Sequence, residues 1–292
     1  MFLAAAIVGS VAGFGSVYTN AFGAGTLYER LLSKIDRFMT GPPPPDRATV
    51  ATITVTEPPT TPEPTASLTP PASGGPSATA APTPTPIPRV GVDVDIVQNH
   101  KAVFAHELRD DWCAPAGITI VLAILGHGGA TDAREREIAG RIHEWETYAD
   151  SHNYEWGPGA MVGALDAYGA KGYQIRAYES RATALRESAR AISLTHSPVI
   201  LLAWRGAHTW VMSGYRADAD PTVFKDARVS GAYILDPWYP WNSSIWGQSD
   251  PPGAFQNAAE MVRNFLPWKR PEGHYPDRDG KFIVVMPTIP AG

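Results

Sequence analysis

Residues 110–126 read DDWCAPAGITIVLAILG and hold the only cysteine of the chain, Cys113. From 118 to 125 this segment is apolar apart from one threonine, and Gly126 follows directly, so it predicts a buried helix that ends at a glycine. Pro115 suits the first turn of that helix, where a missing backbone N–H does no harm. We therefore expect Cys113 at or just before the helix N-terminus, where the helix dipole and unpaired N–H groups lower the pKa of a thiol.

This segment alone leaves two interpretations of Cys113 open. A thiolate at a helix start is a nucleophile, which would be a functional role. A cysteine beside Trp112 is equally compatible with a small core residue, because free cysteines are among the most buried residue types.

Composition divides the chain into a part that should fold and a part that should not. All nine tryptophans lie between Trp112 and Trp268, whereas 15 of the 28 prolines lie between Pro42 and Pro88. We therefore expect a single folded domain over residues 90–292, which is long enough to bury a substantial core. The net charge of −5 and the lack of a basic block argue against nucleic acid as a partner.

The N-terminal third is typical of a membrane-tethered or secreted protein. Residues 1–28 carry no charge and are mostly apolar, which predicts a transmembrane anchor or a signal sequence, and the lack of a basic n-region favours the anchor. We expect an amphipathic juxtamembrane segment over residues 29–40 and a disordered Pro/Thr/Ala-rich linker over residues 41–89. Such stalks hold a domain away from a bilayer, so residues 90–292 should lie outside the cytoplasm, on a single-pass protein of the cell membrane or as a secreted domain.

Within the expected domain, helical patterns come first and strand patterns dominate afterwards. The expected helices cover Asp132–Tyr148, Pro158–Tyr168, Ala182–Leu194 and Gly253–Phe265, and the expected strands cover Val90–Val97, Gly172–Tyr178, Pro198–Trp204, His208–Tyr215, Gly231–Pro237 and Lys281–Met286. Helices packed on a largely antiparallel sheet make an α+β fold.

Three residues of these elements supply the parts of a nucleophilic site. Cys113 offers a thiol at a helix start, His208 begins a strand, and Asp236 ends the neighbouring strand. A nucleophile, a base and a carboxylate that orients the base form the arrangement used by cysteine and serine hydrolases. We expect Trp112 and Trp210 to pack around this site. Taken singly, His208 also fits an ordinary core histidine, and Asp236 a turn-forming Asp-Pro.

Three stretches of the chain resemble the C39-like branch of the papain-like cysteine peptidases. They are DWCAPAG at 111–117, AHTWVMSGY at 207–215 and YILDP at 233–237. The resemblance implies a papain-like fold over roughly residues 90–290, with Cys113 as nucleophile, His208 as general base and acid, and Asp236 holding the imidazole. It also implies a peptide or protein substrate and neither a metal nor an organic cofactor.

One position departs from the papain-like pattern. Enzymes of this kind carry a glutamine about six residues before the nucleophile, where its amide donates to the oxyanion, and here that residue is Glu107. An ionised carboxylate cannot donate a hydrogen bond, so Glu107 fits an oxyanion hole only if it is protonated. An unperturbed glutamate is ionised at neutral pH, and only desolvation would raise its pKa far enough. Gln98 is the alternative donor if the intervening loop folds back.

These observations support three hypotheses for the function. The first is thiol-dependent hydrolysis of peptide bonds through an acyl-thioester at Cys113. The second is a catalytically impaired relative that binds peptides or a cell-surface polymer in the same cleft, and the third is a structural surface module with a buried cysteine. No metal site is predicted, because the H-E-x-x-H pattern that begins at His143 has threonine at position 147. The sequence gives no indication of the oligomeric state.

Overall fold

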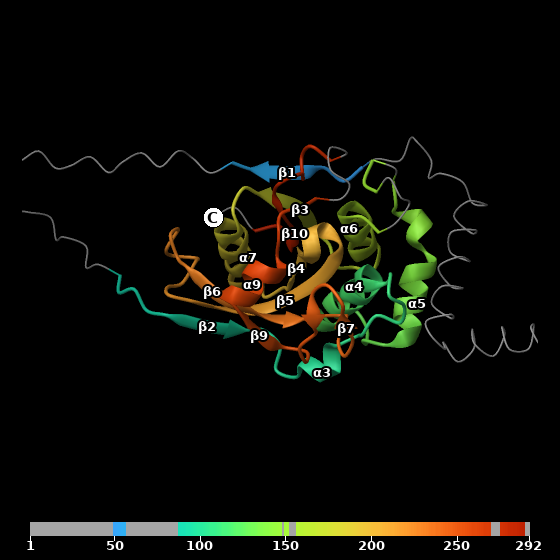
Figure 1. Ribbon diagram of the computed structural model, residues 1–292, viewed down its shortest axis with the longest axis horizontal. Helices are drawn as coiled ribbons and strands as arrows, with labels where there is room; N and C mark the ends of the chain where they lie inside the picture. Colours follow the sequence, from blue (N-terminus) through green and yellow to red (C-terminus); the bar gives the residue numbers. More distant parts are fainter. Residues whose placement is uncertain (1–48, 57–86, 148, 152–155, 270–274, 290–292) are drawn as a thin grey trace, which may run out of the picture.

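The computed structural model describes residues 49–56, 87–147, 149–151, 156–269 and 275–289 (Figure 1). The predicted membrane anchor (1–28) and juxtamembrane segment (29–40) lie outside these residues, so both stay predictions. In the parts of the chain that are described, no helix combines the length and the apolar character needed to cross a bilayer.

The fold is built on one eight-stranded sheet in the order β1-β3-β10-β4-β5-β6-β9, and β2 pairs with the C-terminal part of β5. Neighbouring strands are antiparallel, except that β1 and β3 are parallel. The strands are β1 (Thr52–Val55), β2 (Val92–Asp95), β3 (Tyr173–Tyr178), β4 (Val199–Leu202), β5 (His208–Ala217), β6 (Val229–Leu235), β9 (Ala254–Asn257) and β10 (Phe282–Pro287). A separate small hairpin is formed by β7 (Asn242–Ser243) and β8 (Gly247–Gln248).

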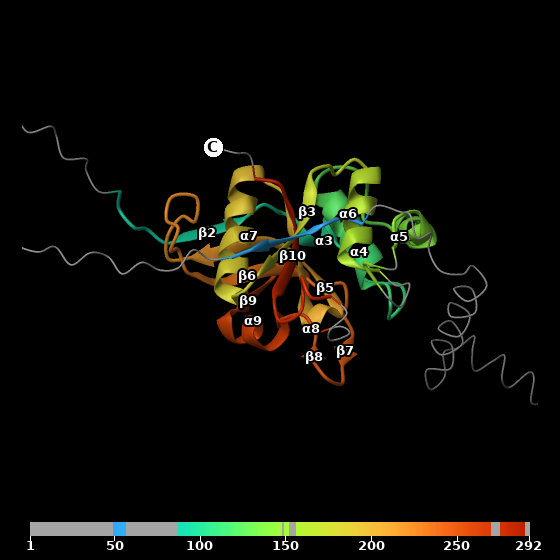
Figure 2. The same cartoon turned by 90° about the horizontal axis from the view of Figure 1, so that it is seen from above.

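Helices cover both faces of this sheet (Figures 1 and 2). Helices α4 and α6 pack on one face of the sheet and α7 packs on the other. One buried hydrophobic cluster lies between the sheet and the helices on each face. In β5, Val211 belongs to the first cluster while Trp210 and Met212 belong to the second, as a period of two requires. The helices are α3 (His100–Val103), α4 (Cys113–Ile124), α5 (Asp132–Gly140), the 3₁₀ turn η2 (Ile142–Glu144), α6 (Pro158–Ala167), α7 (Arg181–Thr195), α8 (Ala203–Gly206) and α9 (Ala258–Asn264). The α+β prediction is confirmed.

Part of the predicted disordered linker is folded. Thr52–Val55 forms β1 at the edge of the sheet and pairs with β3, so the assignment of all of 41–89 to a linker was wrong for this stretch. Its sequence, TITV, is β-branched at every position and contains no proline, and it adds to an otherwise open strand edge. The Nε–H of Arg278 donates to Thr52 Oγ1 at 3.0 Å, which ties the strand to the body of the domain. The proline content of the whole linker had hidden this short segment.

The helix predicted over Asp132–Tyr148 is shorter than expected. It ends at Gly140, and a separate 3₁₀ turn follows over Ile142–Glu144. Glycine is a poor helix former, and it interrupts the polar periodicity that suggested one continuous helix. Tyr148 lies outside the described residues.

The helix predicted over Gly253–Phe265 is half strand. Ala254–Asn257 pairs with β6 as β9, and only Ala258–Asn264 is helical. Asn257 marks the change, because its side-chain oxygen accepts hydrogen bonds from the first backbone N–H groups of α9. Helical periodicity alone could not locate this N-cap inside the longer pattern.

The segment 110–126 forms α4 as predicted. Cys113 is the first helical residue, and Gly126 adopts a left-handed φ of +76° just after the C-cap. The helix lies directly against β5 at Gly117, where a Cβ atom would stand 2.4 Å from Thr209 Cγ2. Since no side chain fits at this contact, Gly117 sets how closely the start of the helix approaches the start of the strand.

We predict that Gly117→Ala destabilises the fold by about 1 to 3 kcal/mol, because the added methyl group forces α4 away from Thr209. Gly140→Ala is the matched control, since nothing lies within 4 Å of a Cβ at this position in α5. The control should be neutral or stabilising by up to about 1 kcal/mol. Urea unfolding measures both, and equal midpoints for Gly117→Ala and the wild type would contradict the tight contact.

Candidate active site

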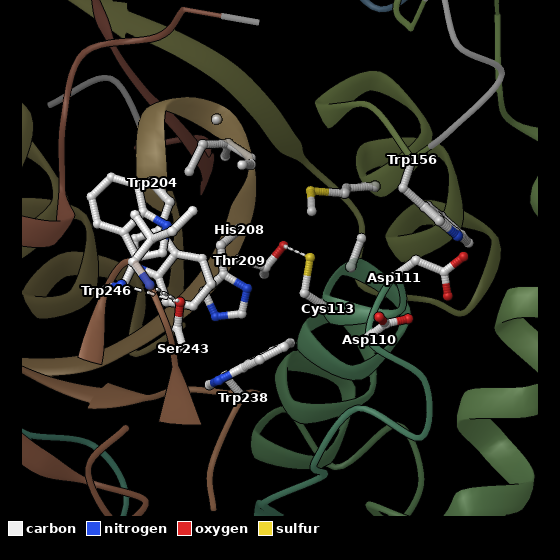
Figure 3. A pocket seen from close by; sticks show the side chains of 16 residues that line it. Asp110, Asp111, Cys113, Trp156, Trp204, His208, Thr209, Trp238, Ser243 and Trp246 are labelled. Atoms are coloured by element: carbon white, nitrogen blue, oxygen red, sulfur yellow. Dashed lines mark hydrogen bonds between the residues drawn. The ribbon is translucent and has the colours of Figure 1, made fainter. Parts of the chain in front are cut away.

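Cys113 and His208 face one another where α4 meets β5. The two side chains point toward each other across this junction in Figure 3, and Cys113 Sγ lies within 4.8 Å of a ring nitrogen of His208. Cys113 is partly exposed, and the Thr209 hydroxyl donates to its Sγ at 3.8 Å. The fold therefore brings the helix-start thiol and the strand-start histidine together, although 95 positions separate them in the sequence.

Asp236 holds the imidazole from the other side. His208 Nε2 lies 2.7 Å from Asp236 Oδ1, and both residues are buried. The same oxygen accepts from the backbone N–H of Trp238 at 2.9 Å, which fixes the carboxylate at the end of β6. Because Nε2 is taken by Asp236, Nδ1 is the ring nitrogen left for Cys113.

The electrostatics of the pair favour a thiolate beside an imidazolium. Burial raises the pKa of the Cys113 thiol, but the hydrogen bond and charge of His208 and the Thr209 hydroxyl more than offset this and leave the pKa below its ordinary value. Burial lowers the pKa of His208, whereas Asp236 and Cys113 raise it, and the net shift is upward. The opposite shifts mean that the proton resides on His208 over the neutral range.

Glu107 lies beside this pair and is fully buried. Its backbone N–H donates to the Pro237 carbonyl at 2.9 Å, which ties its segment to the end of β6. A carboxyl oxygen lies within 4.8 Å of the ligand atoms of Cys113 and His208, yet neither oxygen has a hydrogen-bond partner among the described residues. Burial, together with the nearby Cys113 charge, raises the pKa of Glu107 to about 9. Glu107 is therefore a neutral acid at pH 7 and carries an O–H that can donate, which is the condition that an oxyanion role requires.

Gln98, the alternative oxyanion candidate, is placed elsewhere. It is exposed in the segment that follows β2, whereas Glu107 is buried with a carboxyl oxygen within 4.8 Å of Cys113 Sγ. Of the two candidates, Glu107 is the one beside Cys113.

A cleft of about 440 Å³ opens over Cys113 and His208. On one side it is lined by Trp204, Trp238 and Trp246, and on the other by Trp156 and the acidic pair formed by Asp110 and Asp111 (Figure 3). The cleft thus combines aromatic walls with the polar groups of Cys113, His208, Thr209 and the two aspartates.

The tryptophans at the cleft are not the ones that the sequence suggested. The guanidinium carbon of Arg109 lies 5.1 Å from the centroid of the Trp112 ring, and Trp210 is buried in the core beneath α7. Neither tryptophan is among the described residues that line the cleft. Trp204 instead stacks on His208 with a centroid separation of 3.9 Å. Its φ of 51° is left-handed, which strand periodicity could not reveal. Trp238 could have been predicted as a cleft residue from the sequence, because it stands two residues after Asp236.

In the described parts of the chain, one group of side chains is spaced to hold a metal ion. The ligand atoms of Glu107, Cys113 and His208 all lie within 4.8 Å of one another.

The comparison with known protein families identifies one match. The model of the Peptidase_C39 like family matches residues 93–264, which is more than half of the chain and includes Glu107, Cys113, His208 and Asp236. No curated protein and no solved structure matches the chain significantly.

We predict that native Cys113 reacts with iodoacetamide at a pH well below the free-thiol pKa of about 8.5, because His208 stabilises the thiolate. His208→Ala should return the pH profile to that of the urea-unfolded chain. His127→Ala, a change in the turn after the far end of α4, is the control and should leave the profile unchanged. Identical profiles for native and unfolded protein would show that Cys113 is an ordinary buried thiol.

Burial of Glu107 also predicts a pH-dependent stability. Its pKa rises from an ordinary 4.5 to about 9 on folding, so the folded chain keeps a proton that the unfolded chain loses over this range. Stability is therefore lost as the pH rises through this window, by about 1.4 kcal/mol per pH unit from this one group.

Glu107→Gln removes this penalty. In urea unfolding, the free energy of unfolding of the variant should therefore rise relative to that of the wild type as the pH increases from about 5 to 8. Glu144→Gln, at an exposed carboxylate paired with Arg141, is the control and should show a small difference that does not grow with pH. A constant difference for Glu107→Gln would mean that Glu107 is ionised in the folded state.

Proposed function

The chain belongs to the Peptidase_C39 like family, and we propose that it is a cysteine peptidase that hydrolyses peptide bonds through an acyl-thioester at Cys113. The observation that carries this proposal is the juxtaposition of Cys113, His208 and Asp236 with a buried neutral acid, Glu107, next to a cleft that Cys113 and His208 line. These groups supply a nucleophile, a proton carrier, an orienting carboxylate and an oxyanion donor.

In the first half of the proposed reaction, the Cys113 thiolate attacks the carbonyl carbon of the scissile bond. A C–S bond forms and the carbonyl π electrons move to the oxygen. The imidazolium of His208 then gives its proton to the amine nitrogen as the C–N bond breaks, which leaves a thioester on Cys113. Asp236 stabilises the imidazolium before the transfer and holds the ring so that Nδ1 faces the substrate.

In the second half, neutral His208 takes a proton from a water molecule that attacks the thioester. The C–S bond breaks, the acid product leaves, and the thiolate–imidazolium pair is restored. The oxyanion of both steps would receive hydrogen bonds from the Cys113 backbone N–H, in the first turn of α4, and from the Glu107 O–H. A neutral carboxylic acid thus takes the part that an amide plays in papain-like enzymes.

The shape of the cleft supports a polypeptide as substrate. Its walls come from different parts of the fold, with α4 and the segment at Trp156 on one side and β5 with the β7–β8 hairpin on the other. An extended chain lying between these walls would place apolar side chains against Trp204 and Trp246, which stack with each other at a centroid separation of 5.6 Å. The aromatic wall suits apolar side chains, and the polar groups that also line the cleft could bind the backbone of an extended peptide.

A second function is favoured by the carboxyl group at Glu107. If the neutral acid stabilises the oxyanion poorly, the same cleft would bind peptides or a cell-surface polymer without turning them over. The two functions are separated by comparing the wild type with Cys113→Ala, since binding survives loss of the thiol whereas turnover does not.

The proposed location is outside the cytoplasm. It is supported by the charge-free residues 1–28 and by the Pro/Thr-rich composition of 41–89. An unpaired cysteine is a liability in an oxidising compartment unless it is used or protected, and Cys113 lies beside His208 in a cleft.

We predict that the full chain, incubated with a complex peptide mixture, generates new peptide termini detectable by mass spectrometry, and that Cys113→Ala generates none. Glu107→Ala should lower turnover about 100- to 1000-fold through loss of an oxyanion donor, whereas Glu107→Gln, a neutral donor of equal length, should lose less than about tenfold. Wild-type turnover should fall as the pH passes the Glu107 pKa of about 9, and that of Glu107→Gln should not. Cleavage that persists in Cys113→Ala would contradict the proposal.

For the location, we predict that protease added to intact cells releases a fragment containing residues 90–292 by cutting within the linker. A cytoplasmic protein of the same cells should stay intact as the control. Protection of the fragment until the cells are lysed would show that the domain lies inside.

A further inference from the structure

Glu107 has a property that the proposed reaction does not need. An amide would donate the same hydrogen bond to the oxyanion without the penalty of burying a carboxyl group that has no partner among the described residues. A carboxyl group, unlike an amide, can lose its proton and bind a cation as an anionic ligand. The neighbours of Glu107 show which cation that would be.

The side chains of Cys113, His208 and Glu107 match the ligand set of zinc. A thiolate, an imidazole and a carboxylate are the three kinds of protein ligand that Zn²⁺ accepts, and tetrahedral coordination sets neighbouring ligand atoms roughly 3.5 Å apart. Here the ligand atoms of Cys113, His208 and Glu107 lie within 4.8 Å of one another, so side-chain rotations of roughly an ångström would close the site.

The surroundings also fit a metal ligand at His208. Metal-binding histidines usually donate their other ring N–H to a carboxylate, which orients the ring and raises its basicity. His208 Nε2 has this partner in Asp236 Oδ1 at 2.7 Å, which leaves Nδ1 for the metal. Zn²⁺ binding would release the protons that Glu107 and His208 carry in the free protein, and the thiolate and the carboxylate would then neutralise the divalent ion. The fourth coordination position would face the cleft, which offers a path of entry.

From this geometry we infer that Cys113, His208 and Glu107 form a binding site for Zn²⁺, and that the bound ion silences the thiol. The metal occupies the sulfur lone pair that would attack a carbonyl and the His208 nitrogen that would carry the proton. The binding site stands on its own geometry, and only the silencing rests on the proposed peptidase function.

Binding of the metal alone is the first test. The purified full chain, freed of metal with a chelator, is titrated with Zn²⁺ by calorimetry, and with Co²⁺ to detect thiolate-to-cobalt charge-transfer absorption. We expect binding and a thiolate band in the wild type and loss of the band in Cys113→Ala. Glu107→Gln should weaken Zn²⁺ binding by at least about 100-fold, more than the loss of an outer-shell partner typically does. Asp111→Asn is the matched control, because it removes a cleft-lining carboxylate outside the cluster, and should change the affinity less than about threefold.

Equal Zn²⁺ affinity in the wild type and Glu107→Gln, or no thiolate band in the wild type, would overturn the inference.

Thermal unfolding of each variant distinguishes a loss of Zn²⁺ binding from a loss of fold. If Glu107→Gln does not fold, Cys113→Ala provides a second test of the site. Inhibition of peptide cleavage by Zn²⁺, reversed by chelator, tests the silencing. A Glu107-dependent thiolate band without any peptide cleavage would support the metal site and contradict the proposed peptidase function. Peptide cleavage without metal binding would support the peptidase function and contradict the metal site.

Discussion

The contact of α4 with β5 at Gly117 and Thr209 is the constraint on which the site depends. It sets the helix start against the strand start, and only at that junction can Cys113 reach His208. The sheet order then supplies the rest, because β6 is paired with β5 and ends beside the histidine at Asp236. The Glu107 N–H donates to the carbonyl of Pro237, the residue after Asp236, so the position of Glu107 also depends on how β6 pairs with β5. A shift of one strand or of the helix would separate all four.

The charge balance of the site follows from this packing. Four ionisable groups share a small buried volume, and they cannot all be charged at once at an acceptable free energy. The structure resolves this by placing the proton of the thiol on His208, keeping Asp236 hydrogen-bonded, and leaving Glu107 protonated. Burying Glu107 destabilises the fold above its ordinary pKa, and the apolar clusters on both faces of the sheet must offset that loss. Such a penalty is typical of residues kept for function rather than for stability.

Local sequence patterns were sufficient for much of the fold and for the thiol, histidine and carboxylate of the site. The apolar run after Pro115 predicted α4, and strand periodicity placed His208 and Asp236 at strand ends, where neighbouring strands bring side chains together. Long-range packing was not available from those patterns. The protonation of Glu107 depends on how deeply the fold buries it, and Trp204 reaches His208 only through a left-handed backbone. For the same reason β1 was missed, since a short TITV segment becomes a strand only because β3 has an edge to pair with.

In the proposed reaction, Cys113, activated by His208, accepts an acyl group. The most direct measurement is the intact mass of the full chain after brief reaction with an activated peptide ester, quenched in acid and mapped by proteolysis. We expect one acyl group per chain on Cys113, formed far faster in the native protein than after unfolding in urea and lost in Cys113→Ala. An acyl group on other residues, or equal rates on Cys113 in the native and unfolded chains, would contradict it.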